Sequence, residues 1–132
     1  MAGSTIKSDD DLKRLLEQIW ISPLGLEASQ DLHEGVLLEQ HYENMQVAWA
    51  LKTRDGWEVS AGKAPELPNM RLFYSGDALE RLSQSRDLED FSTKLQDLIG
   101  DRDLVFIPLR SPDMLAEVGF GEFAERLGLP GK

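Results

Sequence analysis

Two histidines and three glutamates lie close together in the first third of the chain and are candidates for a metal site. His33 and His41 stand among Glu34, Glu39 and Glu43, and imidazole and carboxylate groups are common zinc ligands. The histidines are eight residues apart, which does not match the i, i+4 spacing of a helical HExxH site. On one extended strand they would lie about 26 Å apart. Because isolated surface histidines are commoner than ligands, we predict no metal site.

A glycine pattern near the C-terminus has the form of a dinucleotide-binding motif. Residues 119–124 read G-F-G-E-F-A and match G-x-G-x-x-A. In a dinucleotide site this pattern follows a strand and opens a helix whose N-terminus receives the pyrophosphate. Here a helical pattern precedes it, and Glu122 would repel a pyrophosphate. We therefore interpret the glycines as a hinge between two helical segments and expect no cofactor.

Other residue types that perform catalysis occur without the arrangement that they need. Asp101 and Asp103 flank the start of a predicted strand, where solvated turn residues are expected. The serines lack the G-x-S-x-G pattern of a nucleophile elbow, and the absence of cysteine excludes thiolate chemistry. We identify no catalytic residue and expect a protein that is not an enzyme.

The strongly negative charge argues against two classes of partner. The chain has 24 acidic and 14 basic residues and a net charge of −10. Nucleic acids and anionic lipid surfaces both attract lysine and arginine, so we expect neither nucleic-acid binding nor stable membrane insertion. No apolar run approaches the roughly 20 residues that span a bilayer.

The length and composition favour one globular domain. With 132 residues, 41% of them hydrophobic, the chain is long and apolar enough to bury a core. The lack of cysteine fits a reducing cytoplasm, and the N-terminus lacks the pattern of a signal peptide. We expect a cytoplasmic protein with a single domain over residues 1–132, of which residues 1–7 show no periodicity and are expected to be disordered.

The most readable stretch predicts a hairpin. Large apolar residues alternate with smaller or polar ones from Met45 to Lys52, which is typical of a half-buried strand. A second alternation runs from Trp57 to Ala61. Between them, Asp55-Gly56 favours a tight turn because this pair accepts positive φ angles. We predict that residues 45–52 pair antiparallel with residues 57–61.

The remaining elements follow from periodicity, caps and prolines. Pro65 and Pro68 keep residues 62–68 extended and unpaired. Pro108 places the end of the last strand at a sheet edge or a bulge. The predicted order starts with a helix that begins within residues 8–11 and that Pro23 and Gly25 end, followed by a strand within 36–44, the hairpin and a strand over 69–74. It continues with a helix opening at Ser75 or Asp77, a helix after Asp87 to about 100, a strand over 104–109 and a final helical segment after Ser111-Pro112.

The N-terminal helix is amphipathic and has two interpretations. Its apolar residues recur at helical spacing, which suits either a protein core or a membrane surface. Membrane-surface helices carry many lysines and arginines on the polar face, whereas this segment mixes acids with only Lys13 and Arg14. We favour core packing. Pro23 and Gly25 are predicted to end the helix.

The stretch from Trp49 to Leu109 resembles the sterol carrier protein 2 family. The matching features are the hairpin over residues 50–57, the connector and strand over residues 61–73, and the helix over residues 75–82, followed by a second helix and a last strand. The resemblance implies an α+β fold with an antiparallel-rich sheet of about five strands and helices packed on one face. It also implies a hydrophobic small-molecule ligand, such as a lipid, in an apolar cavity between sheet and helices. The residues expected to line that cavity are Trp49, Leu51, Val59, Leu72, Phe91, Leu95, Leu98 and Phe106.

A second function class stays open at this point. An interaction or regulatory module would fill the same space and present an apolar patch outside, with a homodimer formed through the last strand, which is apolar on both faces. Apolar residues that line a cavity and apolar residues that fill a core have the same sequence pattern, so the sequence does not separate a carrier from a filled module.

Overall fold

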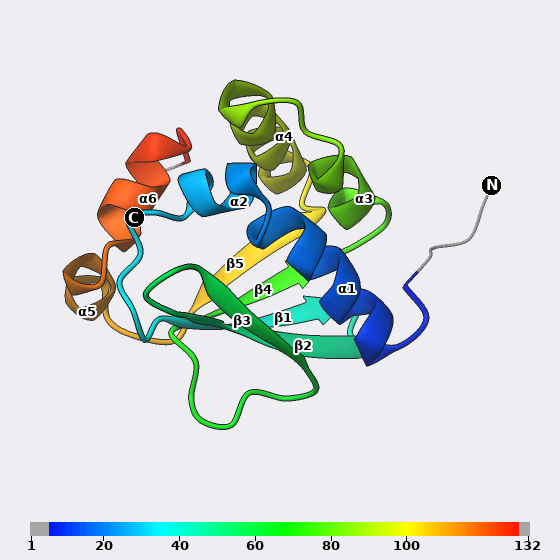
Figure 1. Ribbon diagram of the computed structural model, residues 1–132, viewed down its shortest axis with the longest axis horizontal. Coiled ribbons are helices and arrows are strands. Elements are labelled where there is room, and N and C mark those ends of the chain that lie inside the picture. Colours follow the sequence, from blue (N-terminus) through cyan, green and yellow to red (C-terminus); the bar gives the residue numbers. More distant parts are fainter. Residues whose placement is uncertain (1–5, 130–132) are drawn as a thin grey trace.

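The computed structural model describes residues 6–129, which form a five-stranded sheet and six helices. Figure 1 shows α1 to α4 over one face of the sheet, with the loop that follows β3 on the opposite side. The elements are α1 (Asp9–Trp20), α2 (Pro23–Ala28), β1 (Leu37–Tyr42), β2 (Gln46–Lys52), β3 (Trp57–Ala61), β4 (Met70–Tyr74), α3 (Ala78–Ser83), α4 (Leu88–Gly100), β5 (Leu104–Pro108), α5 (Pro112–Glu117) and α6 (Phe120–Arg126).

The sheet is mixed, which refines the predicted fold class. Its strand order is β3-β2-β1-β4-β5. The hairpin prediction is confirmed, because β2 pairs antiparallel with β3. β1 pairs antiparallel with β2 and parallel with β4, and β4 pairs antiparallel with β5. The α+β class with about five strands is therefore right, and the central β1–β4 pair is parallel.

The proline-containing connector explains that parallel pair. Residues 62–69 leave β3 at one edge of the sheet and re-enter on the far side of β1. A parallel connection ordinarily needs a dozen or more residues. Eight residues suffice when they are extended, because they then reach about 26 Å. The connector passes over the outer face, where the Ala64 amide donates a hydrogen bond to Glu39 Oε2 at 2.9 Å.

The N-terminal helix begins and ends as its side chains dictate. The Ser8 hydroxyl accepts a hydrogen bond from the Asp11 amide at 3.1 Å, and Asp9 to Asp11 place negative charge at the positive end of α1. The helix ends at Trp20, three residues before Pro23. Pro23 does more than stop it, because this proline occupies the first turn of a second helix, α2, which the sequence analysis missed.

The segment expected to be disordered lies partly within the described chain. Residues 1–5 fall outside the described residues. Ile6, however, is buried with 4% of its surface exposed, and the Lys7 amide donates a hydrogen bond to Asp11 Oδ2 at 3.0 Å. The expectation of disorder is therefore wrong for Ile6 and Lys7.

Candidate ligand-binding site

The layer between sheet and helices holds six of the eight predicted lining residues. Residues directly opposite one another on paired strands point to the same face. Val59 pairs with Ala50, and Leu72 pairs with both Gln40 and Phe106. Because Gln40 in turn pairs with Ala48, this register puts Val59, Leu72 and Phe106 on one face of the sheet, the helix-facing side. Phe91, Leu95 and Leu98 of α4 are buried on the helix side of the layer.

The other two predicted residues lie on the opposite face of the sheet. Trp49 and Leu51 are partly exposed, while Ala48 and Ala50 between them are buried at 0% and 1% exposure. The assignment of Trp49 and Leu51 to the inner layer is therefore wrong. The physical reason is the close approach of α1 to β2, since small alanine side chains let a helix lie near the strand. The larger residues then turn towards the connector side.

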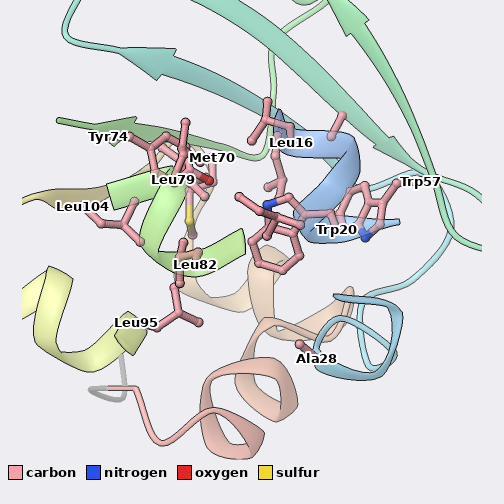
Figure 2. Packing of buried hydrophobic residues seen from close by; sticks show 14 of the residues in the cluster. Leu16, Trp20, Ala28, Trp57, Met70, Tyr74, Leu79, Leu82, Leu95 and Leu104 are labelled. Atoms are coloured by element: carbon pink, nitrogen blue, oxygen red, sulfur yellow. The ribbon is translucent and has the colours of Figure 1, made fainter. Parts of the chain in front are cut away.

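An aromatic cluster fills the centre of the layer. Trp20 of α1 packs against Phe91 with ring centroids 5.6 Å apart and nearly perpendicular planes, and against Trp57 at 6.4 Å. Such edge-to-face contacts stabilise aromatic pairs beyond the area they bury. Figure 2 shows Trp20 between Tyr74 and Trp57, with Leu16 nearby. Phe91, Leu95 and Leu98 are each at most 1% exposed, so the layer is packed in this state.

A groove of about 260 Å³ leads towards this cluster from the surface. It lies where the end of α1 and the start of α2 face the end of α3 and the start of α4. Its apolar lining comes mainly from Ile19, Leu24, Leu82 and Phe91, and serines and an arginine stand among the other lining residues. Of the eight residues predicted to contact ligand, Phe91 is the one that lines this groove.

The layer also contains polar side chains that the sequence analysis did not identify. Gln40 of β1 is fully buried, and the Tyr74 hydroxyl donates a hydrogen bond to Gln40 Oε1 at 2.5 Å. Burial raises the pKa of Tyr74 far above its usual value, although the nearby Trp20 side chain works in the opposite direction, so Tyr74 is uncharged. The sequence holds a signal for Gln40. Leu38, Gln40 and Tyr42 are two residues apart and so share one face of a strand, and a face that buries Leu38 and Tyr42 also buries the glutamine.

A second polar cluster lies on the outer face of the sheet. Glu39 is 6% exposed and accepts hydrogen bonds from Arg71 Nε at 2.8 Å, from the Ala64 amide and, at Oε1, from His41 Nε2 at 2.9 Å. The His41 ring stacks on Phe73 with centroids 4.7 Å apart. Burial alone would raise the pKa of Glu39, but the hydrogen bonds from Ala64, His41 and Arg71 outweigh it and lower that pKa below its usual value.

The same outer face carries a shallow hollow of about 300 Å³. Phe73, Val105 and Ile107 form its apolar part, and Glu43 and Arg102 are among the polar residues around it. Val105 and Ile107 are 40% and 42% exposed. The outer face of β5 is therefore an exposed apolar surface beside a sheet edge.

Two further predictions concern metals and membranes. Within residues 6–129, no group of three or more histidine, aspartate or glutamate side chains is arranged to hold a metal ion. His33 lies exposed in the loop before β1, whereas the His41 ring stacks on Phe73 on the outer face of the sheet. In the same part of the chain, no helix has the length and apolar character to cross a membrane.

Gly119, with φ 98°, joins α5 to α6, as the hinge interpretation predicted.

Comparison with known proteins bears on the fold. No family model and no curated protein matches this sequence. Among solved structures, a ubiquinone synthesis protein, UbiJ-SCP2, is 16% identical, with a TM-score of 0.53 over 90% of this chain and 94% of that one. The fold is that of the sterol carrier protein 2-like proteins. Sterol carrier protein 2 from Yarrowia lipolytica, in its apo form, also matches, at 16% identity and a TM-score of 0.42 over 83% and 88% of the two chains.

The sterol carrier protein 2-like fold does not by itself assign a role to the groove or to the polar side chains. At 16% identity a structural likeness carries over the path of the chain and not its ligand. The predicted resemblance is therefore confirmed for the fold. Any function has to be argued from the residues of this chain.

Proposed function

We propose that this protein binds a long hydrophobic ligand between its sheet and helices, and that the ligand enters through the groove at α1, α2, α3 and α4. The observation that carries the proposal is the position of Phe91. Its ring lines the groove on one side and packs against Trp20 on the other. A surface opening and the apolar centre of the molecule thus share one side chain.

The size of the groove requires that side chain to move. Pockets for small molecules usually measure about 300–1,000 Å³, and the groove holds about 260 Å³. A ligand that displaced the Phe91 ring would gain the apolar surface of Trp20, against which that ring packs. The proposed ligand-bound state is therefore an opened form of the packed layer, reached through a population shift rather than through a permanent cavity.

The energetics favour a long apolar chain over a short one. Each buried methylene contributes about 0.8 kcal/mol, and ten contribute about 8 kcal/mol. Association costs roughly 4–15 kcal/mol in lost translational and rotational freedom, to which the displacement of Phe91 adds. Short ligands would not offset these costs. The proposed role needs no catalytic residue, and it is non-enzymatic.

A blocking substitution tests the entry route. Leu24 is partly buried and lines the groove, while its neighbour Ile21 is 38% exposed and does not line it. We expect Leu24→Trp to weaken the binding of an uncharged fluorescent long-chain probe about tenfold, and Ile21→Trp to leave that affinity unchanged. Both variants should unfold at similar denaturant concentrations to the parent. A folded parent protein that binds no probe, and that carries no lipid in native mass spectrometry, would refute the proposed function.

The exposed apolar surface on β5 favours one alternative, an interaction module that keeps its layer filled. Val105, Ile107 and Phe73 adjoin a sheet edge where a second strand could pair. This alternative predicts self-association that Ile107→Lys abolishes, measured by sedimentation equilibrium. It also predicts no probe binding. A monomer that binds the probe would decide for the ligand carrier.

A further inference from the structure

We infer that the ligand of this protein carries an uncharged hydrogen-bond acceptor, such as an ester or ketone carbonyl, which receives hydrogen bonds from Gln40 and Trp20 inside the layer. The inference rests on the proposed function and specifies the chemistry of its ligand. It is carried by two buried N–H donors in the region that the described residues enclose.

The two donors lie beside one hydroxyl group. Gln40 is 0% exposed, Trp20 is 3% exposed and Tyr74 is 1% exposed. The Tyr74 hydroxyl donates its proton to Gln40 Oε1 at 2.5 Å, and the Trp20 indole lies close enough to that hydroxyl to lower its pKa. Tyr74 thus connects Gln40 on β1 with Trp20 on α1.

Both donors have an unused hydrogen-bonding capacity. Among residues 6–129, Gln40 Nε2 has no acceptor at hydrogen-bonding geometry. Trp20 Nε1 lies beside the Tyr74 hydroxyl but likewise does not meet that geometry. An unsatisfied buried donor is destabilising, and most buried polar groups in native proteins are paired. Gln46 Oε1, a buried acceptor without a partner, lies on β2 opposite Tyr42 and makes no hydrogen bond to either donor. The cluster therefore holds two N–H donors that no protein acceptor meets at hydrogen-bonding geometry, and a ligand acceptor would satisfy them.

The charge of the surroundings selects an uncharged acceptor over a carboxylate. An ionised carboxylate buried without a cation is strongly unfavourable. Lys52 is the buried lysine on the helix-facing side, and its Nζ donates to the Leu32 carbonyl oxygen at 3.0 Å. The register places Ala48 opposite Gln40, and Lys52 lies four residues further along β2, about 13 Å away. Tyr74 is uncharged and already donates its proton to Gln40.

The route from the groove reaches these donors through one aromatic contact. Phe91 lines the groove and packs against Trp20 with centroids 5.6 Å apart. Movement of the Phe91 ring would expose the Trp20 ring, whose Nε1 is one of the two donors. The apolar chain of a ligand would occupy the groove and the Phe91 position, and its carbonyl end would reach Gln40.

Ligands of one chain length separate this inference from the proposed function. We would measure displacement of the uncharged probe by a C16 hydrocarbon, by the methyl ester of the C16 acid and by the acid itself at neutral pH. We expect the ester to bind about tenfold more tightly than the hydrocarbon and than the ionised acid, which corresponds to about 1.4 kcal/mol. Equal binding of ester and hydrocarbon would overturn the inference and leave the proposed function standing. Binding of none of the three would overturn both.

Variants then assign the preference to the named residues. The double substitution Gln40→Met with Tyr74→Phe removes both hydrogen-bonding partners and keeps their size, which is close to neutral for stability. It should abolish the preference for the ester, and Trp20→Phe should reduce it. Trp49→Phe on the outer face and Gln96→Met, which loses a hydrogen bond to the Leu127 carbonyl, are the matched controls and should keep it. An ester preference that survives the double substitution refutes the assignment.

A spectroscopic readout checks the hydrogen bond itself. The carbonyl stretch of a ¹³C-labelled ester should lie at lower frequency when bound to the parent protein than when bound to the double variant. If the Gln40→Met and Tyr74→Phe protein fails to fold, Trp20→Phe alone supplies the same comparison. An unchanged carbonyl frequency in a folded variant contradicts the inference.

Discussion

Glu39 and Arg71 are direct neighbours on the parallel strands β1 and β4, and their side chains form an ion pair with Arg71 Nε 2.8 Å from Glu39 Oε1. The same carboxylate receives the Ala64 amide of the connector. The buried carboxylate of Glu39 therefore binds the connector, residues 62–69, to the outer face of the sheet. The connector in turn sets the parallel arrangement of β1 and β4.

The stability of the protein should depend on the protonation of Glu39. Its pKa is lower in the folded chain than the usual value, since hydrogen bonds from Ala64, His41 and Arg71 outweigh the opposing effect of burial. The unfolded chain therefore binds the proton more tightly than the folded chain. The stabilisation is present above the unfolded pKa of about 4.3 and is lost as the pH falls through the lower folded pKa.

A glutamine at this position should remove that pH dependence. We expect Glu39→Gln to lower the free energy of unfolding by about 1–3 kcal/mol at pH 7, because a hydrogen bond to a charged group is stronger than one to an amide. The difference from the parent should shrink below pH 4. Urea unfolding across this range measures it, with Glu58→Gln on the exposed side of β3 as the control. Identical pH profiles for parent and Glu39→Gln would contradict the role assigned to the carboxylate.

The hinge glycine between α5 and α6 should not tolerate a side chain. Gly119 has a φ of +98°, and a Cβ there would stand 2.0 Å from the Asp31 carbonyl oxygen. A backbone atom cannot rotate away, so we expect Gly119→Ala to destabilise the fold by several kcal/mol. Gly121, two residues on, is exposed in α6 and has open space for a Cβ. Gly121→Ala should be stabilising by up to about 1 kcal/mol. Thermal unfolding of both variants tests the contrast, and equal changes would contradict it.

The hairpin and the helices could be predicted because their determinants are local. Asp55-Gly56 sets the turn between β2 and β3, and the Asp87 side chain caps α4 by accepting a hydrogen bond from the Asp90 amide at 2.8 Å. The parallel pairing of β1 with β4 was not predictable in this way. It depends on where the connector crosses, and that is fixed by contacts such as Ala64 with Glu39, which are 25 residues apart.

The inner face of β2 was misjudged for a related reason. Trp49 and Leu51 have the larger apolar side chains, and size alone favours burying them. The structure buries Ala48 and Ala50 because α1 lies close over this strand. The alternation of side chains in β2 was predicted correctly, but the wrong set of alternate residues was assigned to the inner face. A shift of one residue moves every side chain of a strand to the opposite face. The donors of Gln40 and Trp20 escaped notice because the two residues come together only when β1 and α1 pack.

The negative charge leads to a prediction about surfaces. A chain with a net charge of −10 should bind neither duplex DNA nor vesicles that contain anionic lipid at physiological salt. Fluorescence anisotropy with labelled DNA and co-sedimentation with vesicles test this. Neutral vesicles are the control for adsorption. Vesicle binding that persists at raised salt would contradict the prediction and would favour a membrane role for α1.

Removal of the Phe91 ring tests the proposed opening of the layer. Phe91 is 1% exposed and packs against Trp20, so Phe91→Ala should lower the free energy of unfolding by about 3–5 kcal/mol. The same substitution removes the side chain that a ligand has to displace. A saturating long-chain ligand should therefore raise the melting temperature of Phe91→Ala more than that of the parent, since binding to the folded state alone stabilises it in proportion to affinity.

A matched cavity elsewhere distinguishes ligand binding from general repair of a damaged core. Leu127 is 0% exposed and does not line the groove. Leu127→Ala should lose about 2–5 kcal/mol, a loss similar to that of Phe91→Ala, and it should gain from the ligand no more than the parent gains. Differential scanning calorimetry of the three proteins, with and without ligand, gives both quantities. Equal ligand-induced shifts in Phe91→Ala and Leu127→Ala would show that Phe91 is not the gate, because any void would then serve the ligand equally well.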